Sequence, residues 1–215
     1  MTNKSKVDKV PKTKADQILN EVLTDLKIKD KKPGEKFEHI YKLFPELNKL
    51  NETDKFSVST TGTITERVCG WALEAAIPDG HFRLTSNDDK WLGDYCLLGT
   101  PFNAVISVKS YKVKERLLVS GSGSLLVPTI GWGFMDDPNE FKYERLKNYL
   151  YRGFIAIYLP KDTLLKTEKN SKELLNTHKN LFLRPIENLV KDIKNCSLKK
   201  KMGDKSITVV DPKKF

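Results

Sequence analysis

Cysteine and histidine are scarce in this chain of 215 residues, which holds three of each. Cys69, Cys96 and Cys196 are odd in number and far apart, so they do not suit the disulfide framework of a small secreted domain. No Cys-x-x-Cys pair or Cys/His cluster has the spacing of a zinc site, and the scattered histidines remove the usual pairings of a nucleophile with a histidine base. We therefore expect a protein of the reducing cytoplasm.

The chain also lacks long apolar runs and an excess of acidic residues over basic ones. No stretch approaches 18 consecutive apolar residues, and no apolar segment follows the charged N-terminus as it would in a secretory signal. We therefore expect a soluble protein with no membrane partner. Its 38 Lys and Arg residues against 28 Asp and Glu leave a net charge of +10. This balance favours a polyanionic partner, with nucleic acid ahead of an anionic membrane surface.

The chain has enough apolar residues, 39% of the total, to bury one ordinary core. We expect a basic arm (1–14), an N-terminal helical segment (15–55), a core (56–160) and a helical, basic C-terminal segment packed on that core (161–215). Pro33-Gly34 separates two amphipathic patterns in the N-terminal segment, and Pro45 interrupts the second.

Within the core segment, helix and strand patterns alternate in a definite order. Apolar periodicity, turn residues and propensity together predict a helix, three strands, a helix and a strand. Their ranges are Ile64–Ile77, His81–Leu84, Trp91–Leu98, Ala104–Tyr111, Glu140–Arg152 and Phe154–Leu159.

An acid on one expected strand and a lysine on the next carry a resemblance. Gly93-Asp94 is followed, after twelve residues, by Ser107-Val108-Lys109. Between Ile64 and Leu159 the chain resembles the PD-(D/E)XK nuclease core, and in size the small type II restriction endonucleases. The resemblance implies an α/β fold in which a central mixed β-sheet is flanked by helices, with helical additions at both ends.

The chemistry of phosphodiester hydrolysis explains these residue types. Hard oxygen ligands hold Mg²⁺ against a phosphate oxygen, and a cation stabilises or orients the attacking hydroxide. Asp94 is the expected metal ligand, with Val108 beside it, and Lys109 is the expected cation. Strand alternation places Ser107 and Lys109 on the same face. The alternative for Lys109 is an edge-strand side chain that reaches solvent.

The motif departs from the family pattern at Gly93, where proline is usual, and at Ser107, where an acid is usual. Ser107 would then hydrogen-bond a water of the metal site, and another element must supply the carboxylate. The candidates for this missing acid are Glu66, Glu74 and Glu115.

We prefer Glu66, because it shares a helix sector with apolar residues and with Gly70, which lets the helix approach the sheet closely. The alternative is that Glu66 closes a helix capping box with Thr63.

The segment after Lys109 is basic and then rich in serine and glycine. Its candidate DNA contacts are Lys112, Lys114, Arg116, Ser120 and Ser122. The alternative for the Gly/Ser part is an ordinary flexible turn. We interpret the lysines at 199–201 as a run of solvated charges, and the second interpretation is that they contact phosphates.

Two functions follow from these patterns. The first is a Mg²⁺-dependent, sequence-specific endonuclease acting on double-stranded DNA, for which the resemblance implies a homodimer and a cognate DNA methyltransferase. The alternative is a noncatalytic nucleic-acid-binding protein on a degenerate nuclease core. Divalent-metal-dependent cleavage separates the two.

Overall fold

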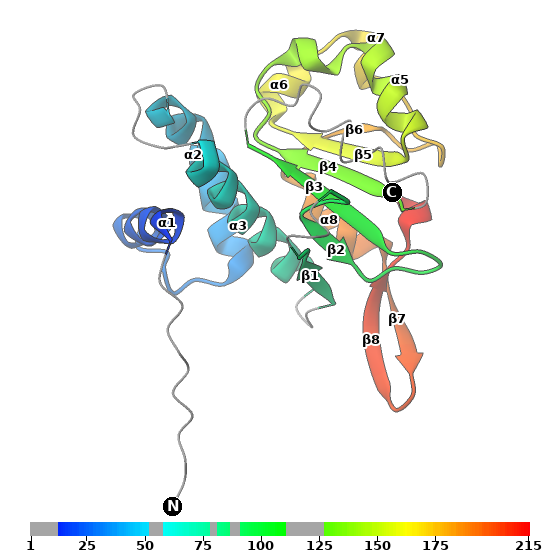
Figure 1. The fold of residues 1–215 in the computed structure, drawn as a ribbon, viewed down its shortest axis with the longest axis horizontal. Helices are drawn as coiled ribbons and strands as arrows, with labels where there is room; N and C mark the ends of the chain where they lie inside the picture. The colour runs from blue at the N-terminus through cyan, green and yellow to red at the C-terminus, as the bar shows by residue number, and fades with distance from the viewer. Residues whose placement is uncertain (1–12, 52–57, 78–80, 87–90, 111–126) are drawn as a thin grey trace, which may run out of the picture.

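A six-stranded mixed sheet organises the chain. The computed structural model describes residues 13–51, 58–77, 81–86, 91–110 and 127–215. The strands are β1 (Phe82–Leu84), β2 (Tyr95–Leu97), β3 (Ala104–Lys109), β4 (Thr129–Gly133), β5 (Phe154–Leu159) and β6 (Leu183–Pro185). They stand side by side in chain order (Figure 1), with antiparallel pairing from β1 to β3 and parallel pairing from β3 to β6.

Helices cover both faces of this sheet, which confirms the expected α/β architecture. One face lies under α3 (Val58–Ala76) and α8 (Asn188–Cys196), and α1 (Lys14–Asp25) and α2 (Pro33–Asn51) pack on α3. The other face packs against the 3-10 helix η3 (Pro138–Phe141), α5 (Tyr143–Tyr151) and α6 (Lys161–Lys166), and α7 (Lys169–Lys172) packs on α5. Two apolar clusters, one on each face, form the core.

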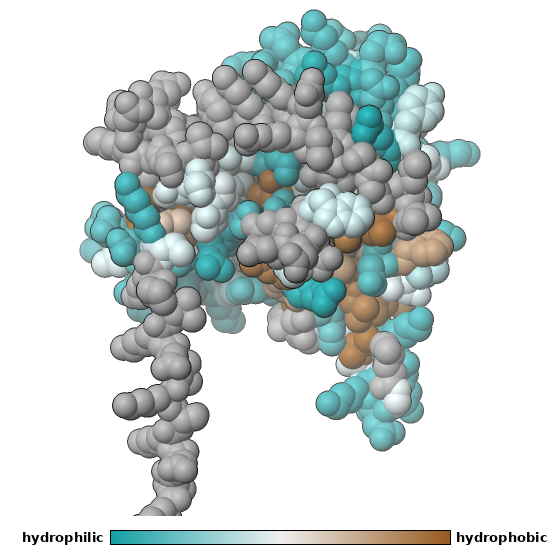
Figure 2. Space-filling model, in the orientation of Figure 1, coloured by the Kyte–Doolittle hydropathy of each residue, from teal (hydrophilic) through white to brown (hydrophobic). Residues whose placement is uncertain are grey.

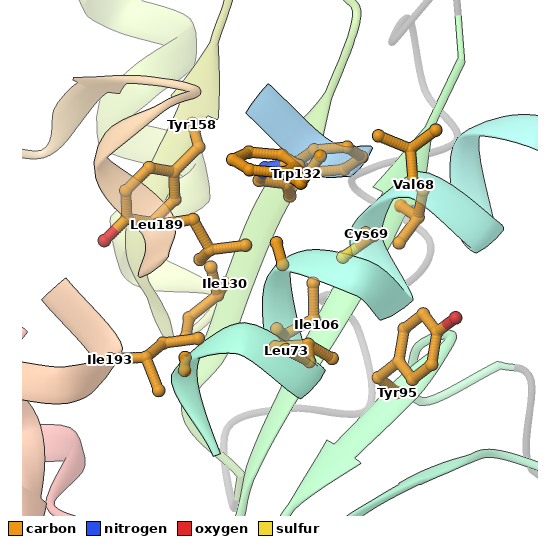
Figure 3. Close-up of a cluster of buried hydrophobic side chains, with 14 of the residues drawn as sticks. Val68, Cys69, Leu73, Tyr95, Ile106, Ile130, Trp132, Tyr158, Leu189 and Ile193 are labelled. Carbon is orange, nitrogen blue, oxygen red and sulfur yellow. The ribbon is translucent and has the colours of Figure 1, made fainter. Parts of the chain in front are cut away.

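The larger cluster sits between the sheet and helices α3 and α8. Val108, Trp132 and Tyr158 occupy one row across β3, β4 and β5, and each is largely or wholly buried. Figure 3 shows the apolar side chains that meet in this cluster, among them Val68, Leu73, Ile106, Ile130, Leu189 and Ile193. Such burial is the main stabilising contribution to a fold of this kind.

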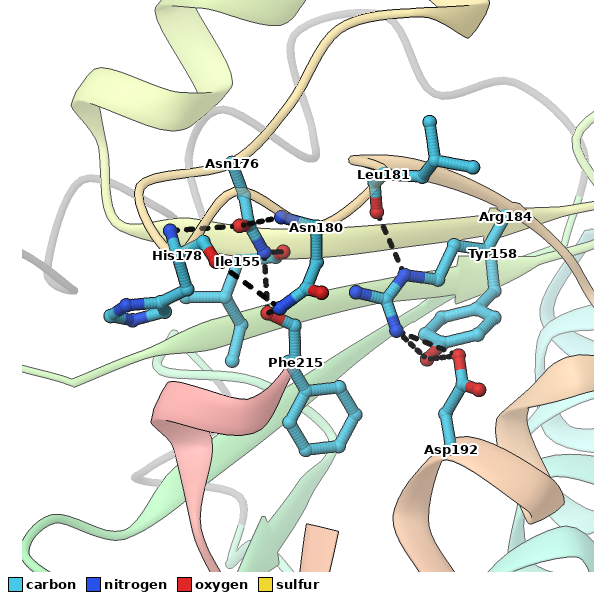
Figure 4. Close-up of polar contacts among 9 residues, drawn as sticks. All are labelled: Ile155, Tyr158, Asn176, His178, Asn180, Leu181, Arg184, Asp192 and Phe215. Atoms are coloured by element: carbon cyan, nitrogen blue, oxygen red, sulfur yellow. Dashed lines mark hydrogen bonds and ion pairs between the residues drawn. The ribbon is translucent and has the colours of Figure 1, made fainter. Parts of the chain in front are cut away.

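Polar contacts tie the C-terminal elements to the parallel edge of the sheet (Figure 4). Arg184 Nη1 lies 2.7 Å from Asp192 Oδ2, and the Tyr158 hydroxyl donates to the same oxygen at 2.7 Å. Asn176 Nδ2 donates to the main-chain oxygens of Ile155 and Phe215, both at 2.7 Å. The first group fastens α8 to β5 and β6, because its three members come from these elements.

The C-terminal segment is not the helical addition that we expected. Beside its helices it contributes β6 to the central sheet, a hairpin of β7 (Ser197–Met202) and β8 (Lys205–Val210), and the 3-10 helix η4 (Pro212–Lys214). Three consecutive exposed lysines in β7 break the alternation of apolar and polar residues that would have indicated a strand. Hydrophilic residues indeed cover the tip of the hairpin (Figure 2).

Other boundaries also differ from the sequence expectations. The helix α2 runs through Pro45, and α3 begins at Val58, six residues before Ile64. The backbone of Lys142 is extended and separates η3 from α5 within the range expected as one helix. β4 was not expected at all. No helix in the described part of the chain is long and apolar enough to cross a membrane.

Candidate active site

Antiparallel pairing of β2 with β3 brings Asp94 and Lys109 together. The main-chain nitrogen of Asp94 donates to the oxygen of Ile106 at 2.7 Å, which places the Asp94 side chain beside the end of β3. Asp94 Oδ2 accepts a 2.6 Å hydrogen bond from the nitrogen of Val108 and lies 3.7 Å from Lys109 Nζ. The side chains of Lys109 and Asp94 are only 18% and 12% exposed, so the pair is largely shielded from water.

Two glycines allow the chain to close around this end of β3. A Cβ at Gly93 would lie 2.9 Å from the oxygen of Ile106. One at Gly133 would lie 1.7 Å from the oxygen of Lys109, a distance that no side chain tolerates. Glycine at 133 therefore permits the close approach of β4, where the nitrogen of Phe134 donates to the Lys109 oxygen at 3.2 Å.

The alternation expected for β3 is confirmed for its apolar face. Ile106 and Val108 belong to the cluster beneath α3, and Lys109 reaches Asp94 on the other side. Ser107 is fully buried and pairs with Gly131 of β4. The lysine therefore meets an anion, and the solvent-reaching alternative for Lys109 is wrong because its side chain is mostly buried.

Glu66 lies well inside α3, so the capping-box alternative is wrong. Because α3 begins at Val58, Thr63 is a helix-interior residue whose hydroxyl donates to the oxygen of Ser59 at 3.1 Å. Glu66 is half-buried. The expected close approach at Gly70 is confirmed, since a Cβ there would lie 2.8 Å from the hydroxyl of Tyr95 on β2.

Besides burial itself, the charges of Asp94 and Glu66 both raise the pKa of one buried thiol, that of Cys69. Cys69 of α3 is fully buried, and burial raises its pKa well above the ordinary value, with the charges of Asp94 and Glu66 as the further causes. Burial also raises the pKa of Tyr95, with contributions from Cys69, Glu66 and Asp94. The charges of Asp94 and Glu66 therefore both influence Cys69 and Tyr95, which lie on α3 and β2.

The remaining candidates do not join this pair in the described structure. Glu74 is exposed on α3. Glu115 and the expected DNA contacts Lys112, Lys114, Arg116, Ser120 and Ser122 lie outside the described residues. Sequence reasoning missed Tyr95, since a tyrosine in a strand carries no sign of a partner 29 positions earlier.

The donor atoms fit a hard divalent cation. Lys109 Nζ donates to the Val108 oxygen at 3.0 Å and faces Asp94 Oδ2, so a carbonyl and a carboxylate oxygen turn toward the same positive charge. Mg²⁺ binds through one or two carboxylates and keeps several waters. Among the described residues no three His, Cys, Asp or Glu side chains gather into a metal group. A cation here would therefore rely on few protein ligands.

Comparison with solved structures finds restriction endonucleases. PspGI, solved as a complex with substrate DNA, aligns with a TM-score of 0.51 and 13% identity over 83% of this chain and 90% of that chain. Ecl18kI, solved metal-depleted with uncleaved, modified DNA, aligns with a TM-score of 0.43 and 15% identity over 82% of this chain and 60% of that chain. The sequence matches no protein-family model and no curated protein. The likeness to PspGI establishes a restriction-endonuclease-like fold.

Proposed function

We propose that this protein is a Mg²⁺-dependent endonuclease that hydrolyses phosphodiester bonds of double-stranded DNA at a specific sequence, as a type II restriction enzyme does. The observation that carries the proposal is the shielded contact between Asp94 and Lys109 at the end of β3. On a restriction-endonuclease-like sheet this pair supplies the two charges that phosphodiester hydrolysis requires, an anion for the metal and a cation for the nucleophile.

Each residue has a definite role in this proposal. Asp94, the main-chain oxygen of Val108 and Glu66 would hold Mg²⁺, which when bound neutralises phosphate charge and acidifies water. Lys109 orients the nucleophile and stabilises the negative charge that develops on it. Ser107 is a hydrogen-bonding neighbour rather than a metal ligand, because a neutral hydroxyl binds Mg²⁺ poorly compared with a carboxylate.

The proposed partners follow from charge and from the structural neighbours. The net charge of +10 favours a polyanion, and PspGI was solved with substrate DNA. A homodimer would match the two-fold symmetry of a palindromic site. A cognate DNA methyltransferase would then protect the host sequence.

Two observations favour the second candidate, a noncatalytic nucleic-acid-binding protein on a degenerate nuclease core. Ser107 is fully buried at the position of the usual acid, and the described residues hold no group of three metal-ligating side chains. In this candidate Asp94 and Lys109 would form a structural ion pair.

Cleavage of unmethylated phage DNA tests the proposal. The purified protein is incubated with the DNA in Mg²⁺ or in EDTA, alongside the variants Asp94→Ala and Lys109→Ala. We expect discrete fragments with Mg²⁺ and none in EDTA. Both substitutions should lower the cleavage rate at least about 100-fold, the usual effect of removing a group that stabilises developing charge.

Lys147→Ala is the matched control for Lys109→Ala, because Lys147 also pairs with an acid but lies on α5, which packs on β5 rather than carrying a site residue. It should cleave like the wild type. Intact DNA on several substrates, with salt-sensitive DNA binding that neither site substitution changes, would leave the noncatalytic candidate.

A further inference from the structure

We propose that Tyr95 is a positioning residue that fixes Glu66 relative to Asp94. Its hydroxyl donates a 2.8 Å hydrogen bond to the main-chain oxygen of Glu66, and Tyr95 follows Asp94 directly in the chain. This bond joins the backbone that carries one proposed metal ligand to the helix that carries another. The inference rests on the proposed function, in which both acids serve the same cation.

The strand side of this link is rigid. Tyr95 is 6% exposed, pairs with Ile106 of β3, and its ring meets that of Phe82 edge-on at a centroid distance of 6.1 Å. Figure 3 shows the Tyr95 ring lying beside Ile106 and Leu73, beneath α3. Backbone pairing and ring packing together leave the hydroxyl little freedom to move.

The helix side of the link needs Gly70. In an α-helix the oxygen of residue 66 accepts from the nitrogen of residue 70, so a second donor must approach directly over residue 70. A Cβ at Gly70 would lie only 2.8 Å from the Tyr95 hydroxyl oxygen. Glycine at this position therefore opens the space through which Tyr95 reaches the Glu66 oxygen.

Together these contacts determine the axial position of α3 on the sheet. A slide by one residue moves the helix 1.5 Å along its axis, which would break the hydrogen bond and bring a side chain against the hydroxyl. Ligand constellations need positions held within about 0.5 Å. The hydroxyl of Tyr95 thus contributes to metal affinity without touching the metal.

Metal binding by Tyr95→Phe tests the role, because this change removes only the hydroxyl and keeps the ring. The probe is Mn²⁺ alone, with free Mn²⁺ counted by electron paramagnetic resonance. We expect the Mn²⁺ dissociation constant to rise about tenfold, as typically follows the loss of an outer-shell partner. Tyr149→Phe is the matched control, since Tyr149 is fully buried in the other cluster. Its Mn²⁺ affinity should equal that of the wild type.

A second pair of variants separates positioning from stability. Gly70→Ala should lower the melting temperature through the clash with Tyr95. The double variant Gly70→Ala/Tyr95→Phe should recover it, because the nearest remaining ring atom, Cζ, lies 3.6 Å from the new Cβ. Its Mn²⁺ affinity should stay as weak as that of Tyr95→Phe. Recovery of affinity together with the melting temperature would overturn the positioning role.

Asp94→Asn distinguishes failure of this inference from failure of the proposed function. If Asp94→Asn loses Mn²⁺ while Tyr95→Phe binds it like the wild type, the positioning role is wrong and the proposed metal site stands. If Asp94→Asn binds Mn²⁺ like the wild type, or the wild type binds none, both proposals are overturned.

Discussion

In the proposed site, Ser107 stands where the resemblance implies an acid, and its burial shows what an acid there would cost. The side chain is fully buried within β3. A carboxylate in such a position is costly unless a cation or hydrogen bonds compensate its charge. A serine avoids this cost in the metal-free protein, and it leaves the proposed metal with fewer protein ligands.

Ser107→Asp should therefore make the stability of the fold depend on metal. In EDTA we expect this variant to lose about 3–5 kcal/mol of unfolding free energy, as buried uncompensated charges do. Saturating Mg²⁺ should restore about 2–3 kcal/mol, the linkage expected near a hundredfold excess over the dissociation constant. Urea unfolding in EDTA and in Mg²⁺ measures both. Ser107→Asn, equal in size but uncharged, should show no Mg²⁺ effect beyond that of the wild type. An equal effect in both variants would contradict the prediction.

Tyr149 provides a pH-dependent test at the residue scale. Burial raises its pKa to about 12, while Arg145 lowers it and Glu140 raises it. Because the pKa is higher in the folded state than the ordinary value of 10.0, the stabilising contribution is complete below pH 10 and is lost as the pH rises toward 12. Between pH 9 and 11, wild type should lose about 1 kcal/mol more unfolding free energy than Tyr149→Phe.

Urea unfolding at a series of pH values measures this difference, in which other tyrosines and cysteines cancel because both proteins contain them. At neutral pH the two proteins should have nearly equal stability, since the hydroxyl of Tyr149 has no hydrogen-bond partner within the described structure. Parallel pH profiles for the two proteins would show that this hydroxyl is not buried.

The residue scale also shows where sequence reasoning succeeds and where it stops. The resemblance implies that Asp94 and Lys109 share one site, and the antiparallel pairing of β2 with β3 does bring the two charges together. The contact of Tyr95 with the Glu66 oxygen depends on how far α3 sits along the sheet. Local patterns do not contain that distance, although Gly70 signals that the two elements approach closely.

At the scale of elements, glycine decides how closely β4 packs on β3. Gly133→Ala should cost about 1–3 kcal/mol of unfolding free energy, because a Cβ there would collide with the Lys109 oxygen. The resulting shift of Lys109 should slow DNA cleavage about 100-fold, the usual consequence of a displacement near 1 Å. Urea unfolding and single-turnover cleavage measure the two effects.

Gly62→Ala is the control, since among the described residues a Cβ at this position in α3 would meet no atom within 4 Å beyond its chain neighbours and its own helix backbone. Alanine is favoured over glycine inside a helix, so this variant should gain about 0.5–1 kcal/mol and cleave like the wild type. If Gly133→Ala proves as stable and active as Gly62→Ala, the close approach of β4 is wrong.

The sequence predicted elements that have a clear pattern of apolar residues, and it missed elements that lack one. β5 has the predicted bounds because Phe154–Leu159 is a continuous apolar run between a glycine and a proline. β4 contains two glycines in five residues, a composition that normally indicates a loop. Gly133 is needed because β3 lies so close to it, and this contact exists only in the assembled sheet. β7 forms through its pairing with β8, and its own lysines indicate no strand.

At the scale of the whole molecule, the proposed function gives each chain one active site. The Asp94–Lys109 contact can serve one phosphodiester bond at a time, whereas the proposed double-strand cleavage needs two bonds cut. We therefore expect two chains on one DNA duplex, related by a two-fold axis. Light scattering of the complex in EDTA should give a protein mass of twice 24.6 kDa.

Mixed dimers test this arrangement through the product they leave. Wild-type chains refolded or co-expressed with an excess of Asp94→Asn chains should form dimers with one active site, and these should nick supercoiled plasmid without linearising it. Among the plasmids that are cleaved, the share of nicked circles should rise with the share of Asp94→Asn chains. The reason is that an inactive chain leaves one strand of the duplex uncut. A complex holding one 24.6 kDa chain per duplex would contradict the dimer. So would linear product that falls with no accumulation of nicked circles, since each active chain would then cut both strands.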